Sequence, residues 1–160
     1  MSFTVLTRNL LLAVLATLLL SACATKVKKV DSQLQGDVYT GTETVEYLAK
    51  GVPDRVFFAT NESVLTTRSR DTLRKQAAWM RNNSSLNFTI EGHADERGTR
   101  EYNLALGERR ANAAKDYLMT YGVSGNRLSV ISYGKERPVN SGSNPLAWSQ
   151  NRRSVTVKAN

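Results

Sequence analysis

The residues best suited to do chemistry lie in one short polar segment, residues 91–99, which reads Glu-Gly-His-Ala-Asp-Glu-Arg-Gly-Thr. Asp95 in this segment is followed fifteen positions later by Arg110. An arginine can bind a carboxylate through two parallel hydrogen bonds, and an aspartate can bind an ammonium group. The two side chains therefore either pair with each other or together hold a zwitterionic ligand, and their spacing alone leaves both readings open.

A metal-dependent hydrolase is a second reading of the same segment. On an extended strand, Glu91, His93 and Asp95 would share one face, as three metal ligands could. Successive same-side positions on a strand are about 6.5–7 Å apart, however, which is too far for all three to reach one ion. We therefore expect no metal site and interpret His93 as a loop histidine that orients its neighbours. No serine accompanies a histidine–carboxylate pair, so we expect that the protein is not an enzyme.

The N-terminus has the pattern of an export signal. Residues 10–20 are apolar apart from Thr17, and this run is too short to cross a bilayer, which needs about 20 helical residues. The following Leu-Ser-Ala-Cys, residues 20–23, resembles a bacterial lipobox, although a stray cysteine after a simple signal peptide is the alternative. The resemblance implies covalent N-acyl and S-diacylglycerol lipid on Cys23, and we expect no other cofactor.

These features divide the chain into three parts. We predict a lipoprotein signal peptide at 1–22, the lipidated Cys23 and a flexible tether at 23–41, and one folded domain at 42–160. Ala24 follows the cysteine, which by resemblance implies sorting to the outer membrane, with the domain on its periplasmic face.

Hydrophobic periodicity predicts the elements that position the polar segment. We expect strands near 44–48, 55–58, 86–91, 128–133 and 155–157, helices from about 66 to 82 and over 101–121, and a helical turn at 146–152. On the longer helix, Arg110 stands at the rim of the inward stripe and can turn its guanidinium toward the loop that holds Asp95. The expected fold is an α/β (α+β) sandwich with a mixed sheet of about four strands and helices packed on it.

Several segments closely resemble the OmpA C-terminal-like peptidoglycan-binding family, and the resemblance covers about residues 55–157. It rests on Gly-His-Ala-Asp-Glu-Arg-Gly-Thr at 92–99, Glu-Tyr-Asn at 101–103, Leu-Gly-Glu-Arg-Arg-Ala-Asn at 106–112, Ser-Tyr-Gly-Lys-Glu-Arg-Pro at 132–138 and Asn-Arg-Arg at 151–153. The resemblance favours the zwitterion reading over a simple internal pair.

The resemblance implies a non-covalent site for the diaminopimelate-containing stem peptide of peptidoglycan. In that family the positions of Asp95 and Arg110 hold the zwitterionic end of diaminopimelate. The remaining implied site residues are Leu106 and Thr99, which would line the pocket, and Arg97 and Tyr102, which would lie nearby.

One site position departs from the family pattern. Asn61 stands where the family usually has an aspartate. Either Asn61 still accepts a hydrogen bond from the ligand's amine, or Glu62 supplies the missing charge, or the pocket accepts a different stem peptide. We also expect Arg152 or Arg153 to pair with a loop carboxylate, and we interpret Trp79 and Trp148 as packing residues.

The net charge narrows the choice of partner. The chain carries 22 Lys and Arg against 14 Asp and Glu, a formal charge of +8, and loss of Arg8 with the signal peptide leaves +7. A nucleic-acid binder is disfavoured, because an exported lipoprotein rarely meets nucleic acid and no platform of aromatic and basic residues is visible. The net positive charge of the chain fits a cell wall that carries carboxylates better than it fits nucleic acid. The resemblance further implies partners in the Tol system, periplasmic TolB in particular, and a role in envelope integrity and cell division.

Overall fold

The computed structural model describes residues 37–159. The predicted signal peptide, Cys23 and most of the predicted tether lie outside the described residues. The elements in chain order are β1 (Tyr47–Ala49), β2 (Val52–Pro53), β3 (Arg55–Phe57), α3 (Thr67–Asn82), β4 (Phe88–His93), α4 (Arg100–Thr120), the 3₁₀ turn η1 (Gly125–Arg127), β5 (Leu128–Gly134), α5 (Pro145–Asn151) and β6 (Arg153–Lys158). None of the helices in this part of the chain has the length and apolar character that a membrane span requires.

The main sheet has four strands in the order β3-β6-β4-β5. β4 and β5 are parallel, whereas β6 runs antiparallel to both β3 and β4. This confirms the predicted mixed sheet and the α/β (α+β) class. The prediction of a strand near 44–48 needs correction, because β1 covers 47–49 and pairs with β2 in a separate two-stranded sheet.

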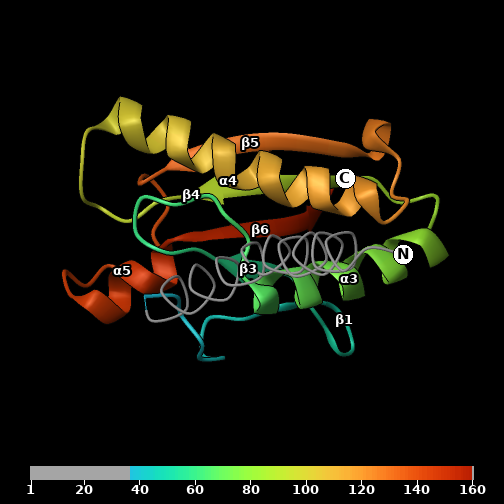
Figure 1. Cartoon of the computed structure of the whole chain (residues 1–160), viewed down its shortest axis with the longest axis horizontal. Coiled ribbons are helices and arrows are strands. Elements are labelled where there is room, and N and C mark those ends of the chain that lie inside the picture. The colour runs from blue at the N-terminus through green and yellow to red at the C-terminus, as the bar shows by residue number, and fades with distance from the viewer. Residues whose placement is uncertain (1–36, 160) are drawn as a thin grey trace, which may run out of the picture. The chain divides into compact units, whose positions relative to one another are not determined.

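Helices α3 and α4 pack over the sheet and enclose the core. Figure 1 shows α4 lying along β4 and β5, with α3 beside β3. The core is built from the apolar stripes of both helices and the facing strand residues, namely Val56, Phe58, Leu73, Ala77, Met80, Phe88, Ile90, Ala111, Ala114, Leu118, Val123 and Leu128. Both helices begin at a threonine whose hydroxyl accepts a main-chain N–H bond, Thr66 for α3 and Thr99 for α4.

The folded domain begins earlier than predicted. Residues 37–41, which we predicted to belong to the tether, are part of the fold. The Tyr39 ring is buried and meets the Phe57 ring edge-on, with 4.8 Å between centroids. Asp37 accepts hydrogen bonds from Thr60 and Arg152. The sequence does not reveal this boundary, because the segment has few large apolar residues and its contacts are with residues elsewhere in the fold.

Two glycines allow α4 to approach β4 closely. A Cβ atom on Gly92 would overlap the main-chain carbonyl of Gly107, and a Cβ on Gly107 would meet both the Ser132 hydroxyl and the Gly92 carbonyl. Each added Cβ would therefore clash with main-chain atoms of the other glycine, and main-chain atoms cannot rotate away as a side chain can. This contact brings the start of α4 against the end of β4, where the polar loop lies.

We expect Gly92→Ala to lower the free energy of unfolding by about 3 kcal/mol, because the added methyl group forces the helix off the strand. The matched control is Gly125→Ala, whose Cβ would meet only the flexible end of Met119 and should change stability by less than about 1 kcal/mol. Urea denaturation measures both. Equal effects of the two substitutions would contradict the close-contact interpretation.

Candidate functional site

The polar loop between β4 and α4 is fixed from several sides. The ammonium group of Lys135 donates to the main-chain carbonyls of Glu96 and Gly98, at 3.2 and 2.8 Å. Gly98 has a φ of +94°, which a residue with a side chain rarely adopts. Thr99 then caps α4 by accepting from the N–H of Tyr102. These constraints hold the loop side chains in defined directions.

Asp95 is the centre of an ion-pair cluster. Its carboxylate accepts two side-chain hydrogen bonds from Arg97, at 3.1 and 2.7 Å, and a third from the Arg97 main-chain N–H. The Nη1 atom of Arg152 lies 3.4 Å from its Oδ2. Burial alone would raise the pKa of Asp95, but the hydrogen bonds from Arg97 and the bond from Arg152 outweigh it and lower the pKa below 3.8. Asp95 is therefore ionised at neutral pH, and Arg152 is the arginine that pairs with a loop carboxylate.

Arg110 is completely buried, and main-chain carbonyls bind its guanidinium. Its Nε donates to the Glu62 carbonyl at 2.8 Å, Nη1 to the His93 carbonyl at 2.9 Å and Nη2 to the Ala59 carbonyl at 3.1 Å. Burial and the neighbouring charge of Arg152 lower its pKa to about 10, so it stays charged at neutral pH. The side chain turns toward the loop end of β4, as predicted, and it ties that end to the turn after β3.

The direct pair between Asp95 and Arg110, one of the two readings from sequence, is absent from the ion pairs of residues 37–159. Asp95 binds Arg97 and Arg152 instead. Leu106 is buried within α4, and Thr99 serves as the helix cap. The predicted site residues thus divide into buried groups and groups that face solvent.

The solvent-facing groups line a hollow of about 300 Å³. It is formed by Thr60, Asn61, Arg97, Gly98 and Tyr102. Three of these, Asn61, Arg97 and Tyr102, were predicted from the sequence, and the turn after β3 faces the loop before α4 across the hollow. Asn61 adopts a φ of +57°, a left-handed conformation that asparagine and aspartate tolerate better than most residues.

Trp148, which the sequence did not mark as a site residue, packs against Arg97. The Trp148 ring lies beneath its guanidinium, 4.3 Å from centroid to Cζ. The Trp148 indole N–H donates to Glu96 at 2.8 Å, and Ser143 donates to the other oxygen of the same carboxylate. Trp148 comes from α5, fifty-one positions after Arg97, so no local pattern in the sequence could reveal this contact. The packing role that we predicted for Trp148 is consistent with this contact.

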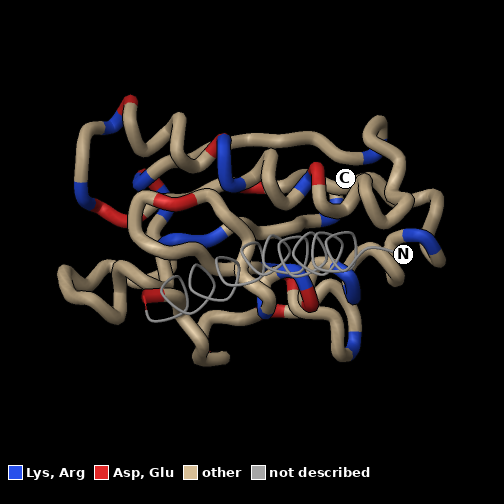
Figure 2. Tube along the Cα trace, viewed as in Figure 1, with Lys and Arg blue, Asp and Glu red and all other residues tan. Residues whose placement is uncertain are grey.

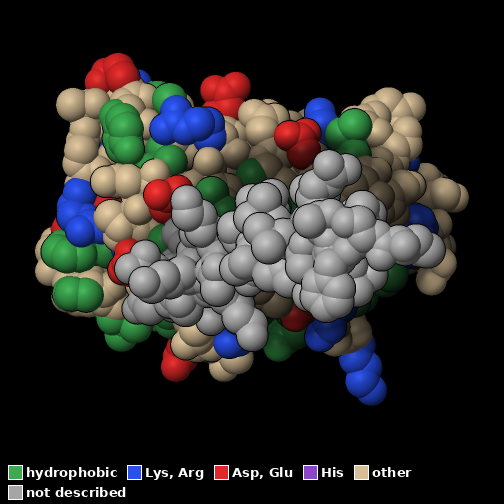
Figure 3. Space-filling model, in the orientation of Figure 1, with side chains coloured by type: hydrophobic (Ala, Val, Ile, Leu, Met, Phe, Trp, Pro, Cys, Tyr) green, Lys and Arg blue, Asp and Glu red, His purple; other side chains and the backbone are tan. Residues whose placement is uncertain are grey.

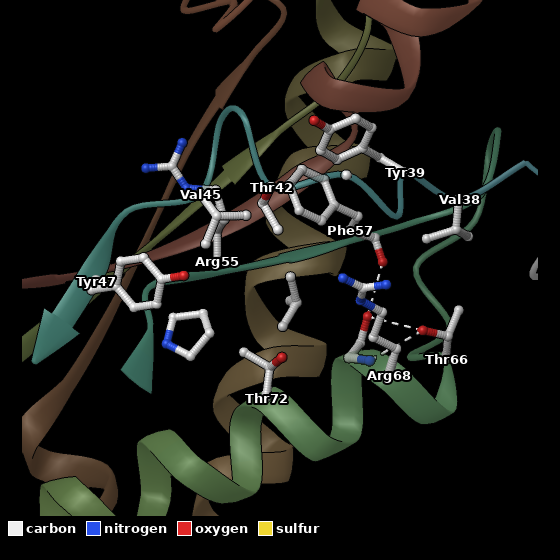
Figure 4. A pocket seen from close by; sticks show the side chains of 14 residues that line it. Val38, Tyr39, Thr42, Val45, Tyr47, Arg55, Phe57, Thr66, Arg68 and Thr72 are labelled. Carbon is white, nitrogen blue, oxygen red and sulfur yellow. Dashed lines mark hydrogen bonds between the residues drawn. The ribbon is translucent and has the colours of Figure 1, made fainter. Parts of the chain in front are cut away.

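A second, more enclosed hollow of about 220 Å³ lies between residues 38–47, β3 and the first turns of α3 (Figure 4). None of the predicted site residues lines it. Its buried polar groups already have partners: Arg55 binds Asp54, and Ser69 bonds to Thr66 and to the Phe57 carbonyl. We therefore place the candidate site at the hollow beside Arg97.

His93 does not belong to a metal site. β4 ends at His93, so Asp95 lies in the loop beyond the strand and the strand alternation assumed for Glu91, His93 and Asp95 does not extend to it. Residues 37–159 contain no group of three His, Cys, Asp or Glu side chains placed to bind a metal. His93 is 2% exposed, and the Glu91 carboxylate, at 3.6 Å from Nε2, is too far away for a hydrogen bond to that nitrogen.

Electrostatics at His93 favour the neutral ring. Burial and the nearby positive charges of Arg153, Arg55 and Arg137 lower its pKa from 6.5 to about 3. The same charges would repel a metal cation. The hydrolase reading therefore finds no support in this arrangement.

The surface charge is dispersed. Figure 2 shows Lys and Arg positions spread over the described elements with acidic positions between them. On the face drawn in Figure 3, acidic, basic and apolar side chains of the described residues are interspersed. Four arginines, namely Arg55, Arg110, Arg152 and Arg153, are buried and contribute little to any charged surface.

Comparison with known sequences connects this geometry to a family. The model of the OmpA family matches residues 57–152. The peptidoglycan-associated lipoprotein of Rhizobium meliloti is 44% identical over 157 residues, which cover 96% of this chain and 89% of the relative. That of Brucella melitensis is 55% identical over 106 residues, covering 66% of this chain and 63% of the relative.

Solved structures agree with this result. The crystal structure of the peptidoglycan-associated lipoprotein from Burkholderia pseudomallei superposes with a TM-score of 0.65 at 35% identity, covering 66% of this chain and 90% of that one. The C-terminal domain of Helicobacter pylori MotB superposes with a TM-score of 0.62 at 19% identity, covering 67% and 84%, which shows a shared fold.

His93 gives a direct test of the site's electrostatics. Because its folded pKa is depressed, it contributes stability above pH 6.5 that is lost as the pH falls toward about 3, while the unfolded chain takes up the proton. We expect the free energy of unfolding to fall by about 2 kcal/mol between pH 6.5 and 5. His93→Phe should remove most of this dependence.

The measurement is urea denaturation at both pH values together with NMR of the histidine ring, which is unambiguous because the chain has one histidine. The folded ring should not titrate between pH 8 and 5. A ring titration centred near pH 6.5 would contradict the buried, neutral state.

Proposed function

The chain belongs to the OmpA family, and we propose that it is a lipid-anchored protein of the outer membrane that binds peptidoglycan non-covalently from the periplasmic face. The observation that carries this proposal is the similarity of almost the whole chain to relatives named peptidoglycan-associated lipoprotein, with the hollow beside Arg97 as the ligand site. Those relatives carry the name of a lipoprotein rather than of an enzyme, and a binding function follows.

The ligand that we propose is the zwitterionic end of diaminopimelate in a stem peptide. One carbon of this group carries an ammonium and a carboxylate, so it can replace an internal ion pair without changing the net charge. The ligand carboxylate would bind Arg97, whose side chain is 42% exposed, and the ammonium would take the place of Arg97 on Asp95. Charge-assisted hydrogen bonds of this kind are worth about 1.5–3 kcal/mol each.

Arg110 has a less direct place in this scheme. Its guanidinium lies beneath the turn at 59–62 and binds the Ala59 and Glu62 carbonyls of that turn. We propose that Arg110 attracts the ligand carboxylate with its positive charge from beneath the turn. Leu106 and Thr99 would support the pocket from α4, and Tyr102 would form its outer wall.

The anchor and the partners complete the proposal. We propose that Cys23 carries the lipid, and that a tether running toward the domain lets it reach the cell wall. Three acyl chains would give stable attachment, since each buried methylene contributes about 0.8 kcal/mol. We further propose that the protein acts with TolB and other Tol proteins in envelope integrity and cell division.

Co-sedimentation with purified sacculi tests the site. We expect Asp95→Ala and Arg97→Ala each to weaken binding at least about tenfold, because each removes one half of the pair that the zwitterion replaces. The matched control is Arg74→Ala, which removes an arginine from an exposed ion pair with Asp71 on α3. Undiminished pelleting of Asp95→Ala combined with Arg110→Ala would reject the site.

Asn61 offers a test in the opposite direction. Aspartate tolerates the left-handed conformation as asparagine does, so Asn61→Asp changes the charge and little else. We expect about threefold to tenfold tighter binding of a soluble diaminopimelate-containing stem peptide, measured by titration calorimetry, because the new carboxylate would face the ligand's ammonium. Asn126→Asp, in the exposed turn η1, is the control. An unchanged affinity would show that Asn61 does not replace a lost charge contact.

A further inference from the structure

Arg152 links the proposed ligand site to the first residues of the folded domain. Its side chain is 2% exposed. One nitrogen, Nη1, lies 3.4 Å from Asp95, and the other, Nη2, lies 2.9 Å from the Asp37 carboxylate and also donates to the Asp37 main-chain carbonyl. Its Nε donates to the Phe58 carbonyl at 3.1 Å. One buried cation therefore serves two carboxylates that are far apart in the sequence.

Asp37 also holds the opposite wall of the hollow. Its second carboxylate oxygen accepts the main-chain N–H of Thr60 at 2.8 Å. Thr60 lines the hollow, and its hydroxyl lies 3.3 Å from Nη2 of Arg97. Asp37 thus touches both the turn that carries Asn61 and the arginine behind Asp95, while it contributes no atom to the hollow itself.

We infer that Asp37 is a positioning residue for the ligand site: it shares the charge of Arg152 and fixes the turn at Thr60, so that Asp95 and Asn61 meet the ligand in a set geometry. This inference rests on the proposed function. Nothing in residues 91–110 predicts it, and Asp37 lies within the segment predicted as the tether, residues 23–41.

The physical reason is a balance of charges. In the cluster Asp37, Arg152, Asp95 and Arg97, opposite charges alternate, and each Asp95 oxygen is shared between two arginines or an arginine and a main-chain N–H. Without the charge of Asp37, Arg152 has Asp95 as its only carboxylate partner among the described residues. Asp95 would be drawn toward Arg152 and would accept the ligand's ammonium less well.

The state of Asp37 supports this reading. Burial raises the pKa of Asp37. The hydrogen bonds from Thr60 and the charges of Arg152 and Arg97 together outweigh burial, so the pKa lies below its usual 3.8. Asp37 is therefore ionised at neutral pH, the condition under which the ligand would be bound.

The test compares Asp37→Asn, Asp37→Glu and Asp71→Asn in the full chain. Asp37→Asn removes the charge but keeps an oxygen that can accept from Thr60. Asp37→Glu restores the charge, and Asp71→Asn makes the same charge change at the exposed pair with Arg74. Binding of a soluble diaminopimelate-containing stem peptide is measured by titration calorimetry, and the amide signals of Thr60 and Asn61 are followed by NMR.

We expect Asp37→Asn to weaken the affinity by about tenfold with an unchanged number of sites per chain, partial recovery in Asp37→Glu and no effect of Asp71→Asn. The Thr60 amide should shift in Asp37→Asn alone. A purely structural role would instead lower the number of competent sites and leave the affinity of the remaining ones unchanged, which would overturn the inference.

Two further outcomes separate the inference from its premise. If the unsubstituted chain binds the stem peptide and Asp37→Asn binds it equally well, the positioning role is rejected and the proposed function stands. If the unsubstituted chain binds neither stem peptide nor sacculi, the proposed function fails and the positioning role is rejected with it.

Discussion

The buried guanidinium of Arg110 is the constraint on which the rest of the site depends. A buried charge must be surrounded by hydrogen-bond acceptors, since an unsatisfied one costs several kcal/mol. Here the acceptors are carbonyls of Ala59, Glu62 and His93, from two separate segments. Satisfying this one group from α4 therefore fixes the turn after β3 against the end of β4, and the hollow forms between the turn and the loop that follows.

The glycine contact makes that arrangement possible. Arg110 reaches the carbonyls only because α4 lies close to β4, and Gly92 and Gly107 permit the approach.

Other arginines also bind main-chain carbonyls inside the domain, as Arg110 does. Arg127, for example, donates to the carbonyl of Met80 in the last turn of α3 and to those of Asn83 and Leu86 just after the helix. A large share of the positive charge thus organises backbone inside the domain, which explains why a basic chain presents a mixed surface.

Local patterns in the sequence predicted much of the fold, and contacts between distant segments account for what they missed. The helices and the strands of the main sheet were found from periodicity and turn residues, because burying one face requires a regular spacing. The place of β6 between β3 and β4 has no local signature. For the same reason Asp37 and Trp148 escaped prediction, since each acts on a loop far away in the sequence. Arg97 was marked as a candidate because it lies in a motif that resembles the family, and Asn61 because it departs from the family pattern.

The alternation of charges around Asp95 suits the proposed exchange with a zwitterionic ligand. In the free protein each carboxylate and each arginine of the cluster already has a partner, so no buried charge is left uncompensated. A zwitterion offers one cation and one anion and can exchange with the Asp95–Arg97 pair, so the gain on binding is the difference between two satisfied states. This net free energy of binding is smaller than the stabilisation that the ion pairs provide in either the free or the bound protein. Because Trp148 and Glu96 already hold Arg97 in place, little side-chain entropy is lost in the exchange, and binding can be specific while remaining reversible.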